Sequence, residues 1–170
     1  MIEAPIRVAL VDDQALFRAG IRMLVESQPD LLFVGEAADG AEGARIAIEA
    51  AADVVLMDIR MPVLDGIAGT ERIVTEAAAR GIPGPRVLVL TTFDLDENAA
   101  RAIRAGASGF VLKDAAAEFL LAAIRTVHAG NSVFSASATR DLITRFTPAP
   151  VAPQPPAAFA ELTAREREMF

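Results

Sequence analysis

Polar and charged residues stand at the ends of four apolar runs of the sequence. Asp12-Asp13 follow IRVALV (6–11), Asp58 follows DVVLM (53–57), Thr91 closes RVLVLT (86–91), and Lys113 closes SGFVLK (108–113). Carboxylates that lie close together repel one another, so a cluster of them favours a bound cation. A hydroxyl and an ammonium beside such a cluster could bind a phosphoryl group. These residue types indicate metal-assisted phosphoryl chemistry, provided that the fold brings them together.

Each of these residues, taken alone, has a simpler interpretation. A single Asp after an apolar strand is usually a turn residue or a helix cap, and Asp12-Asp13 could cap the helix that follows. Lys113 alone would be a surface charge, and Thr91 a hydroxyl at a strand end. It is their joint placement at four strand ends that favours a functional site.

The sequence predicts five strands, each followed by a helix. The predicted strands are 6–11, 31–37, 53–57, 86–91 and 108–113. Most of them are nearly continuous in Val, Leu and Ile, which is typical of strands covered on both faces. Apolar residues at helical spacing between Leu16 and Val25 predict the first helix, and the later helices are predicted over 41–51, 67–80, 95–105 and 115–129.

This alternation predicts a doubly wound α/β domain over 1–131, with a five-stranded parallel sheet and helices on both faces. A flavodoxin-like strand order of 2-1-3-4-5 would place the ends of the first and third strands side by side. Ligands bind at that switch point in doubly wound sheets. Asp12, Asp13 and Asp58 would then converge in one pocket, with Thr91 and Lys113 on its other side.

Three converging carboxylates suit Mg²⁺, which prefers oxygen ligands and commonly binds phosphate oxygens as well. A carboxylate can itself act as a nucleophile and form an acyl phosphate. Phosphoryl transfer requires mainly positioning and charge neutralisation, which a metal ion and a lysine can supply. Asp58 is therefore predicted to be the reactive carboxylate at the tip of a rigid strand.

Composition excludes several other classes of site and partner. The chain has 170 residues and no Cys, so it can form neither disulfides nor a thiolate metal site. No window is long and apolar enough to span a membrane, and the amino terminus does not resemble a secretion signal, so we expect a cytoplasmic protein without a membrane partner. A net charge of -7 argues against nucleic-acid binding by these residues alone.

The residues after 131 differ in composition from the rest. Residues 132–158 are predicted to form a short helix and a Pro-rich linker, with TPAPVAPQPPAA at 147–158 as its most extended part. The segment 159–170 then restarts as a helix, with Thr163 and Glu166 spaced as a capping box. We expect it to begin a further domain of which most is absent.

The motifs VDD, MDIRMPVLDG, LTTF and GASGFVLKD, taken together over about 3–131, closely resemble the receiver domain of bacterial two-component response regulators. The last two motifs, in which Asp114 follows the lysine, are similar to the NarL/FixJ subfamily. In that subfamily a linker joins the receiver to a LuxR-type helix-turn-helix domain. LTAREREMF resembles the opening of that domain, which would leave the recognition helix missing from this sequence.

The resemblance implies a role for each site residue. Asp58 would be the phosphoacceptor, Asp13 a direct Mg²⁺ ligand and Asp12 a ligand through water or hydrogen bonding. The backbone carbonyl of Arg60 would be a further ligand. Lys113 would pair with phosphoryl oxygens, and Thr91 would donate a hydrogen bond to one of them.

The resemblance also implies the biological context. A sensor histidine kinase would donate the phosphoryl group to Asp58, and the protein would act as a signalling phosphoacceptor rather than as an enzyme with a separate substrate. Phosphorylation would favour a homodimer and release DNA binding by the missing carboxy-terminal domain, but not by this fragment. Phe110 stands at the position of the switch aromatic, which is often Tyr in relatives.

Two other functions remain open from the residues alone. The chain could be an atypical receiver, a binding module that responds to a ligand or partner without phosphorylation, although no acidic or lysine position is missing. It could instead be a metal-dependent phosphatase with Asp58 as a turnover nucleophile. That enzyme would need a general acid carboxylate two residues later, where this sequence has Arg60.

Overall fold

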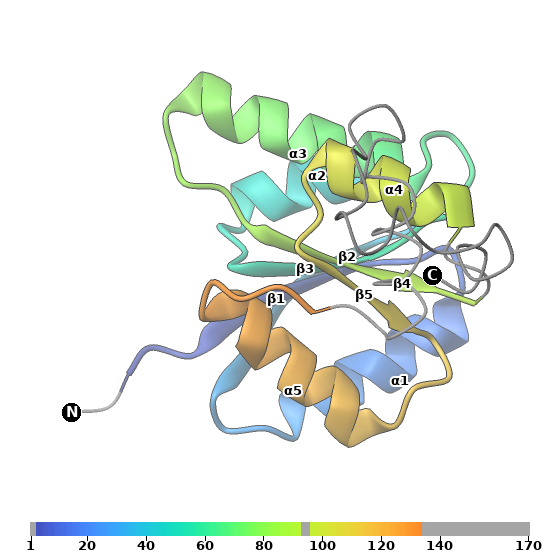
Figure 1. Cartoon of the computed structure of the whole chain (residues 1–170). Coiled ribbons are helices and arrows are strands. Elements are labelled where there is room, and N and C mark those ends of the chain that lie inside the picture. Colours follow the sequence, from blue (N-terminus) through green and yellow to red (C-terminus); the bar gives the residue numbers. More distant parts are fainter. Residues whose placement is uncertain (1–2, 93–95, 134–170) are drawn as a thin grey trace, which may run out of the picture.

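A computed structural model of the chain describes residues 3–92 and 96–133. The predicted helix in 132–158 and the predicted domain start at 159–170 therefore lie almost wholly outside the described residues. Strands and helices alternate in the described part, as predicted (Figure 1). The elements are β1 (Ile6–Val11), α1 (Ala15–Glu26), β2 (Leu31–Ala37), α2 (Gly40–Glu49), β3 (Val54–Asp58), α3 (Gly66–Arg80), β4 (Arg86–Thr91), α4 (Asp96–Ala105), β5 (Gly109–Leu112) and α5 (Ala117–His128).

The five strands form one parallel sheet in the order β2-β1-β3-β4-β5, which confirms the predicted topology. Helices α1 and α5 cover one face of this sheet, and α2, α3 and α4 cover the other (Figure 1). The strand order reverses between β1 and β3, so their carboxyl ends are neighbours.

Alternate residues of each central strand enter separate cores on the two faces of the sheet. Val8 and Leu10 of β1 pack with Val25 of α1, whereas Ala9 and Val11 pack on the opposite face with α2 and α3. Both sets are almost fully buried. Burial on both faces explains why the strands read as continuous apolar runs rather than as alternating ones.

The carboxyl ends of the helices follow the turn residues of the sequence. After α5, Gly130 has a φ of 97°, and its N–H donates to the Val127 carbonyl at 3.0 Å. The N–H of Asn131 donates to the Thr126 carbonyl at 3.1 Å, which completes a Schellman motif. This motif ends α5 at His128. The helix is shorter than the predicted 115–129 because Ala115 lies in a turn closed onto Leu112.

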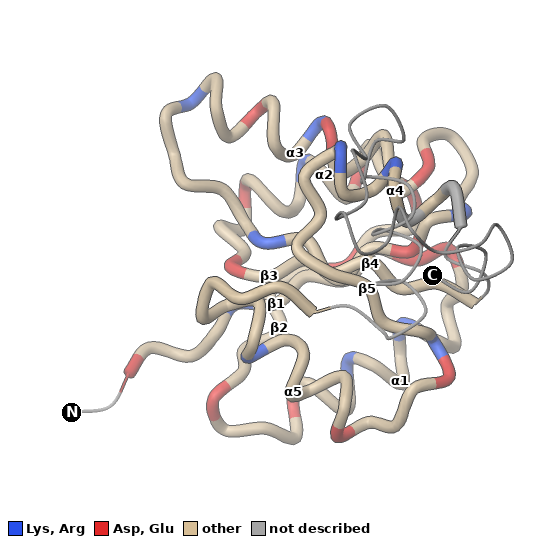
Figure 2. The backbone as a smooth tube through the Cα atoms, viewed as in Figure 1, with Lys and Arg blue, Asp and Glu red and all other residues tan. Residues whose placement is uncertain are grey.

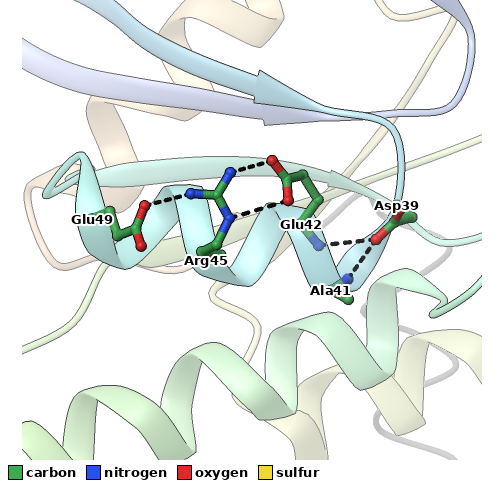
Figure 3. Close-up of polar contacts among 5 residues, drawn as sticks. All are labelled: Asp39, Ala41, Glu42, Arg45 and Glu49. Atoms are coloured by element: carbon green, nitrogen blue, oxygen red, sulfur yellow. Dashed lines mark hydrogen bonds and ion pairs between the residues drawn. The ribbon is translucent and has the colours of Figure 1, made fainter.

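The first turn of α2 is fixed by Asp39, whose carboxylate accepts hydrogen bonds from the backbone N–H groups of Ala41 and Glu42 (Figure 3). Further along the same helix, Arg45 pairs with Glu42 and Glu49 on the exposed surface (Figure 3). Such exposed pairs contribute little to stability. The N-cap is the stronger determinant of where α2 begins, since it satisfies two otherwise unpaired donors.

Gly40, the first residue of α2, touches the loop between β3 and α3. Its N–H donates to the Leu64 carbonyl at 2.8 Å. A Cβ at this position would lie 2.5 Å from the Asp65 carbonyl oxygen, so the close approach requires glycine. The start of α2 thus supports the loop that carries Arg60.

Val63 lies in this loop with an unusual backbone conformation. Its φ is 68°, and the N–H of Leu64 donates to the Pro62 carbonyl at 2.7 Å, which closes a γ-turn around it. A positive φ is unfavourable for a β-branched residue, and γ-turns of this kind are strained. The Val63 side chain is 86% exposed, so packing does not offset the strain.

Replacing Val63 with Gly should raise the free energy of unfolding by about 0.5–1 kcal/mol, because glycine adopts a positive φ without steric cost. The gain is partly offset by the greater freedom of glycine in the unfolded chain. Urea denaturation of both proteins measures the difference. Val63→Ala shortens the side chain without freeing the backbone and should gain less. A Val63→Gly protein less stable than Val63→Ala would show that the turn is not strained.

Beyond α5, the chain returns to the sheet. Val133 forms an isolated parallel bridge with Gly109 at the start of β5. Its carbonyl accepts from the Phe110 N–H at 2.8 Å, and its own N–H donates to the Ser108 carbonyl at 3.2 Å. The contacts of the sheet therefore extend to residue 133, two residues past the predicted end of the domain at residue 131. Among the described residues, no helix has the length and apolar character needed to cross a bilayer.

Candidate phosphoryl and metal site

The register of the sheet places the predicted site residues along one edge. Val11 pairs with Met57, so Asp12 follows β1 next to Asp58 at the end of β3. Thr91 of β4 pairs with Leu112, so Lys113 follows directly beside it, and the Lys113 N–H donates to the Thr91 carbonyl at 2.8 Å. Parallel strands bring these ends to the same side of the sheet. The structure thus brings together the residues that the strand ends predicted.

The three aspartates form a compact cluster. Each of Asp12, Asp13 and Asp58 offers a carboxylate oxygen, and these oxygens all lie within 4.8 Å of one another. Asp12 is fully buried and Asp58 is 6% exposed, whereas Asp13 faces solvent. Two of the carboxylates are thus buried, and the third lies on the solvent-exposed side of the cluster.

Lys113 is the cation that faces this cluster. Its Nζ lies 2.5 Å from Asp12 Oδ2 and 3.3 Å from Asp58 Oδ2, and its side chain is only 9% exposed. It is also the single lysine of the 170-residue sequence. One ammonium therefore faces three carboxylates, which leaves the cluster with a net negative charge.

Asp12 Oδ2 shows that the cluster is not fully satisfied. This buried oxygen accepts no hydrogen bond of acceptable geometry, although the Lys113 ammonium lies within ion-pair distance. A buried carboxylate oxygen without such a bond is unfavourable unless another group binds it. The donor set consists of oxygens only, which suits a hard divalent cation such as Mg²⁺. The residues present therefore fit a magnesium ion.

The pKa of Asp58 reflects the same crowding. Burial raises the pKa of Asp58 from its ordinary value of 3.8 to about 6, and the negative charge of Asp12 adds to the rise. Lys113 acts in the opposite direction, through its charge and a hydrogen bond. Asp58 is thus a carboxylate whose ionised form would be stabilised by an additional cation.

Two hydrogen bonds hold Asp12 in place, one from a backbone N–H and one from the Arg18 side chain. Its Oδ1 accepts a hydrogen bond from the Gln14 N–H at 2.8 Å, which forms a local turn before α1. Its carbonyl accepts from Arg18 Nη1 at 2.6 Å. The N-cap of α1 is Gln14, and no side chain caps this helix, so the simpler interpretation of Asp12-Asp13 as a helix cap is wrong.

Asp58 is held by the close approach of α3. The Gly66 N–H donates to the Ile59 carbonyl at 2.8 Å. A Cβ on Gly66 would lie 1.9 Å from the Asp58 carbonyl oxygen, so no other residue fits there without moving the strand end. The Asp65-Gly66 turn that follows the acidic strand is therefore a steric requirement of the site.

Of the remaining predicted residues, Thr91 and Arg60 line one pocket at this edge, whereas Phe110 does not. Thr91 is buried at the end of β4, and Arg60 is exposed in the loop after β3. Phe110 lies fully buried in β5, within the core below α4. The pocket is lined by Asp13, Gln14, Asp58, Ile59, Arg60, Thr91, Thr92, Asn98 and Lys113.

Gln14 and Asn98 also line this pocket, and neither was predicted from the sequence. Gln14 directly follows the acidic pair, and its Oε1 lies 3.3 Å from Lys113 Nζ. Asn98 is contributed by α4. The convergence of strand ends could not identify either residue, because Gln14 is the N-cap of α1 and Asn98 lies in α4. Proximity to Asp13 in the sequence was the only available signal for Gln14.

Comparisons with known proteins agree with this geometry. The profile of the response regulator receiver domain matches residues 8–125. YxjL, an uncharacterised transcriptional regulatory protein of Bacillus subtilis, is 41% identical over 129 residues, covering 76% of this chain and 57% of YxjL. LiaR, a transcriptional regulatory protein of the same bacterium, is 37% identical over 140 residues, covering 82% of this chain and 64% of LiaR.

Solved structures give the same result. A two-component response regulator of the LuxR family from Aurantimonas sp. SI85-9A1 superimposes with a TM-score of 0.74 at 33% identity, covering 84% of this chain and 98% of that one. The chain spans 57% and 64% of the length of YxjL and LiaR. Because the profile covers most of the sheet and its helices, the chain belongs to the receiver domain family of two-component response regulators, among relatives of the LuxR and NarL type.

Proposed function

We propose that this chain is a phosphorylation-activated receiver that accepts a phosphoryl group on Asp58 from a sensor histidine kinase. Receiver domains are signalling components rather than enzymes with a separate substrate, and the relatives YxjL and LiaR are transcriptional regulators. The observation that carries the proposal is the cluster of Asp12, Asp13 and Asp58 facing a single ammonium at one edge of the sheet.

In the proposed transfer, a carboxylate oxygen of Asp58 attacks the phosphorus of a phosphohistidine. An O–P bond forms while the N–P bond breaks, and the electron pair returns to the imidazole nitrogen of the kinase. Burial keeps Asp58 poorly hydrated, and the approach of Gly66 fixes its backbone, so the nucleophile has little freedom to lose.

Asp13, Asp12, Asp58 and the carbonyl of Arg60 would hold Mg²⁺, which would neutralise charge on the phosphoryl oxygens. Lys113 would pair with a phosphoryl oxygen, since its ammonium already lies within reach of Asp58. The Thr91 hydroxyl would donate a hydrogen bond to another, because β4 ends beside the acidic strand. Hydrolysis of the acyl phosphate by water would return Asp58 to its resting form.

The new dianion would then alter the adjoining surface. Lys113 and Thr91 lie at the ends of neighbouring strands, so a shared bond to one phosphoryl group would draw β4, β5 and α4 together. Phe110 has no phenolic oxygen and is fully buried, so any change at this aromatic works through packing. We propose that the outcome is a homodimer that activates a DNA-binding output domain.

DNA binding itself is assigned to an output domain and not to these residues. Acidic and basic positions are interspersed along the helices (Figure 2). The net charge of the chain is -7, whereas phosphate contacts require clustered Lys and Arg.

Replacing Asp13 with Ala tests the metal part of this proposal. Mg²⁺ affinity should fall by at least about tenfold, and phosphorylation should slow in parallel, because an oxygen ligand is lost from the cluster. The fold should persist, since Asp13 is exposed. Calorimetric titration with Mg²⁺ and a phosphorylation time course measure the two effects.

Asp114→Ala is the matched control, because Asp114 is also exposed and adjoins Lys113 but lies outside the carboxylate cluster. It should bind Mg²⁺ as the unchanged protein does. Equal Mg²⁺ affinity in the Asp13→Ala and Asp114→Ala proteins would remove Asp13 from the proposed ligands.

A further inference from the structure

The ammonium of Lys113 contacts more than the two carboxylates. Its Nζ lies 4.6 Å from the centroid of the Phe17 ring, within the range of a cation–π interaction. Gln14 Oε1 accepts from the same Nζ at 3.3 Å. Phe17 lies in the first turn of α1, one turn after Gln14, and is half-buried against the core below α1 and α5. Helix α1 therefore supplies a second set of contacts to the lysine.

We propose that Phe17 is a positioning residue for Lys113, and that its ring holds the ammonium at the phosphoryl position when the carboxylates no longer do so. This inference rests on the proposed function of Asp58. It concerns a residue of α1 that touches neither the metal ligands nor Asp58 in any described contact, and that acts through the lysine alone.

The ammonium loses part of its attraction to the carboxylates when the site fills. With the site empty, the two carboxylates hold Lys113 through close ion pairs, and the ring adds comparatively little. Once Asp12 and Asp58 are engaged by a cation and a phosphoryl group, they attract the ammonium less. Lys113 then pairs with a phosphoryl oxygen, and the contacts from α1 take over from the carboxylates in holding the long, flexible side chain at that oxygen. A contact shifts an equilibrium only if it matters more in one state than in the other, and Phe17 meets that condition.

A less restrained Lys113 should change the affinities for two ligands in opposite directions. Lys113 competes with a metal ion for the carboxylates, so loosening the lysine should leave Mg²⁺ affinity unchanged or slightly higher. The phosphate mimic beryllofluoride needs the lysine in place, so its affinity should fall. A general loss of structure at the site would weaken both ligands together.

The experiment compares Phe17→Leu, which keeps an apolar side chain but removes the ring, with Phe17→Tyr, which keeps the ring. In the presence of saturating Mg²⁺, Phe17→Leu should bind beryllofluoride roughly tenfold more weakly than the unchanged protein. Its Mg²⁺ affinity should not decrease, and Phe17→Tyr should restore beryllofluoride binding.

Phe33→Leu is the matched control. Phe33 is also half-buried against the same core and also carries a cation over its ring, at 5.0 Å, but that cation is Arg22. Its replacement removes a ring from the same face of the sheet without touching the lysine. Beryllofluoride binding by Phe33→Leu should equal that of the unchanged protein.

A direct readout of the contact does not depend on ligand binding. Because Lys113 is the only lysine, selective ¹³C labelling of lysine gives side-chain NMR signals from this residue alone. An aromatic ring shields nuclei above its face, so the Lys113 ε-methylene signal should lie upfield and should move downfield in Phe17→Leu. It should remain in place in Phe33→Leu.

The outcomes separate the two proposals. If the unchanged protein binds neither Mg²⁺ nor beryllofluoride, the proposed function fails, whatever the NMR signal shows. If it binds both but Phe17→Leu binds beryllofluoride equally well, the positioning role of Phe17 is overturned. Equal weakening of both ligands by Phe17→Leu, or the same loss in Phe33→Leu, would assign Phe17 a structural role only.

Discussion

Incubation with acetyl phosphate and Mg²⁺ should add one phosphoryl group to this chain, seen as a gain of about 80 Da in intact mass. The site for this group is Asp58, a buried carboxylate at the end of β3 that faces one ammonium and two further carboxylates. Without a divalent cation, the incoming phosphoryl oxygens would add to an already negative cluster, so uptake in EDTA should be close to zero.

The Asp58→Asn variant provides the decisive control, because it keeps the shape of the side chain and removes the nucleophile. It should show no gain in mass under any condition. Asp114→Asn changes an exposed acid outside the cluster and should gain the group as the unchanged protein does. Labelling that survives in Asp58→Asn, or that proceeds equally in EDTA, would contradict the assignment of Asp58.

The second large effect concerns stability. Asp58→Asn should increase the free energy of unfolding of the metal-free protein by about 2–3 kcal/mol at pH 7. The pKa of Asp58 is raised by burial, and by the charge of Asp12, to about 6 in the folded protein, against an ordinary value of 3.8. Ionised Asp58 therefore disfavours the folded state, and asparagine removes that charge.

The effect should depend on pH in a defined direction. The folded protein retains the Asp58 proton to a higher pH than the unfolded chain does, so the stabilisation by that proton is complete below pH 3.8. It is lost as the pH rises to about 6, where folded Asp58 also ionises. The advantage of Asp58→Asn should consequently be greatest near neutral pH and small near pH 4.

Urea denaturation in EDTA at several pH values measures this difference, with Asp114→Asn as the exposed control. Addition of Mg²⁺ at pH 7 should narrow the gap, because only the unchanged protein keeps all three carboxylates for the ion. Equal or lower stability of Asp58→Asn at pH 7 would show that ionised Asp58 does not disfavour the folded state.

The fold was largely predictable because its main signals are local. The apolar runs identify strands buried on both faces, and their alternation with helical spacing leads to a doubly wound sheet. Several predicted ends of strands and helices differ from the observed ones by one or two residues. Asp58 is the last residue of β3 rather than the first residue after it, since it still pairs with Leu90 of β4. The pattern of side chains alone cannot show where backbone pairing ends.

The candidate site was predictable only where its residues follow strands. Asp12, Asp13, Asp58, Thr91 and Lys113 lie together because parallel strands end on one edge. Gln14, Phe17 and Asn98 approach the same place from helices, and their direction depends on how α1 and α4 pack. The positive φ of Val63 could not be predicted from the sequence either, because valine is among the residues least suited to a positive φ.

The bridge at Val133 bears on how a signal could leave the domain. Helix α5 runs back across the sheet, away from the phosphoryl edge (Figure 1). After this helix, Val133 lies parallel to β5, and its carbonyl accepts a hydrogen bond from the Phe110 N–H. Val133, the last residue that the structure describes, is therefore held on the outer strand of the sheet. It shares a hydrogen bond with Phe110, the aromatic residue of β5 three positions before Lys113. A displacement of β5 would move Val133 directly through this bond, without passing through α5.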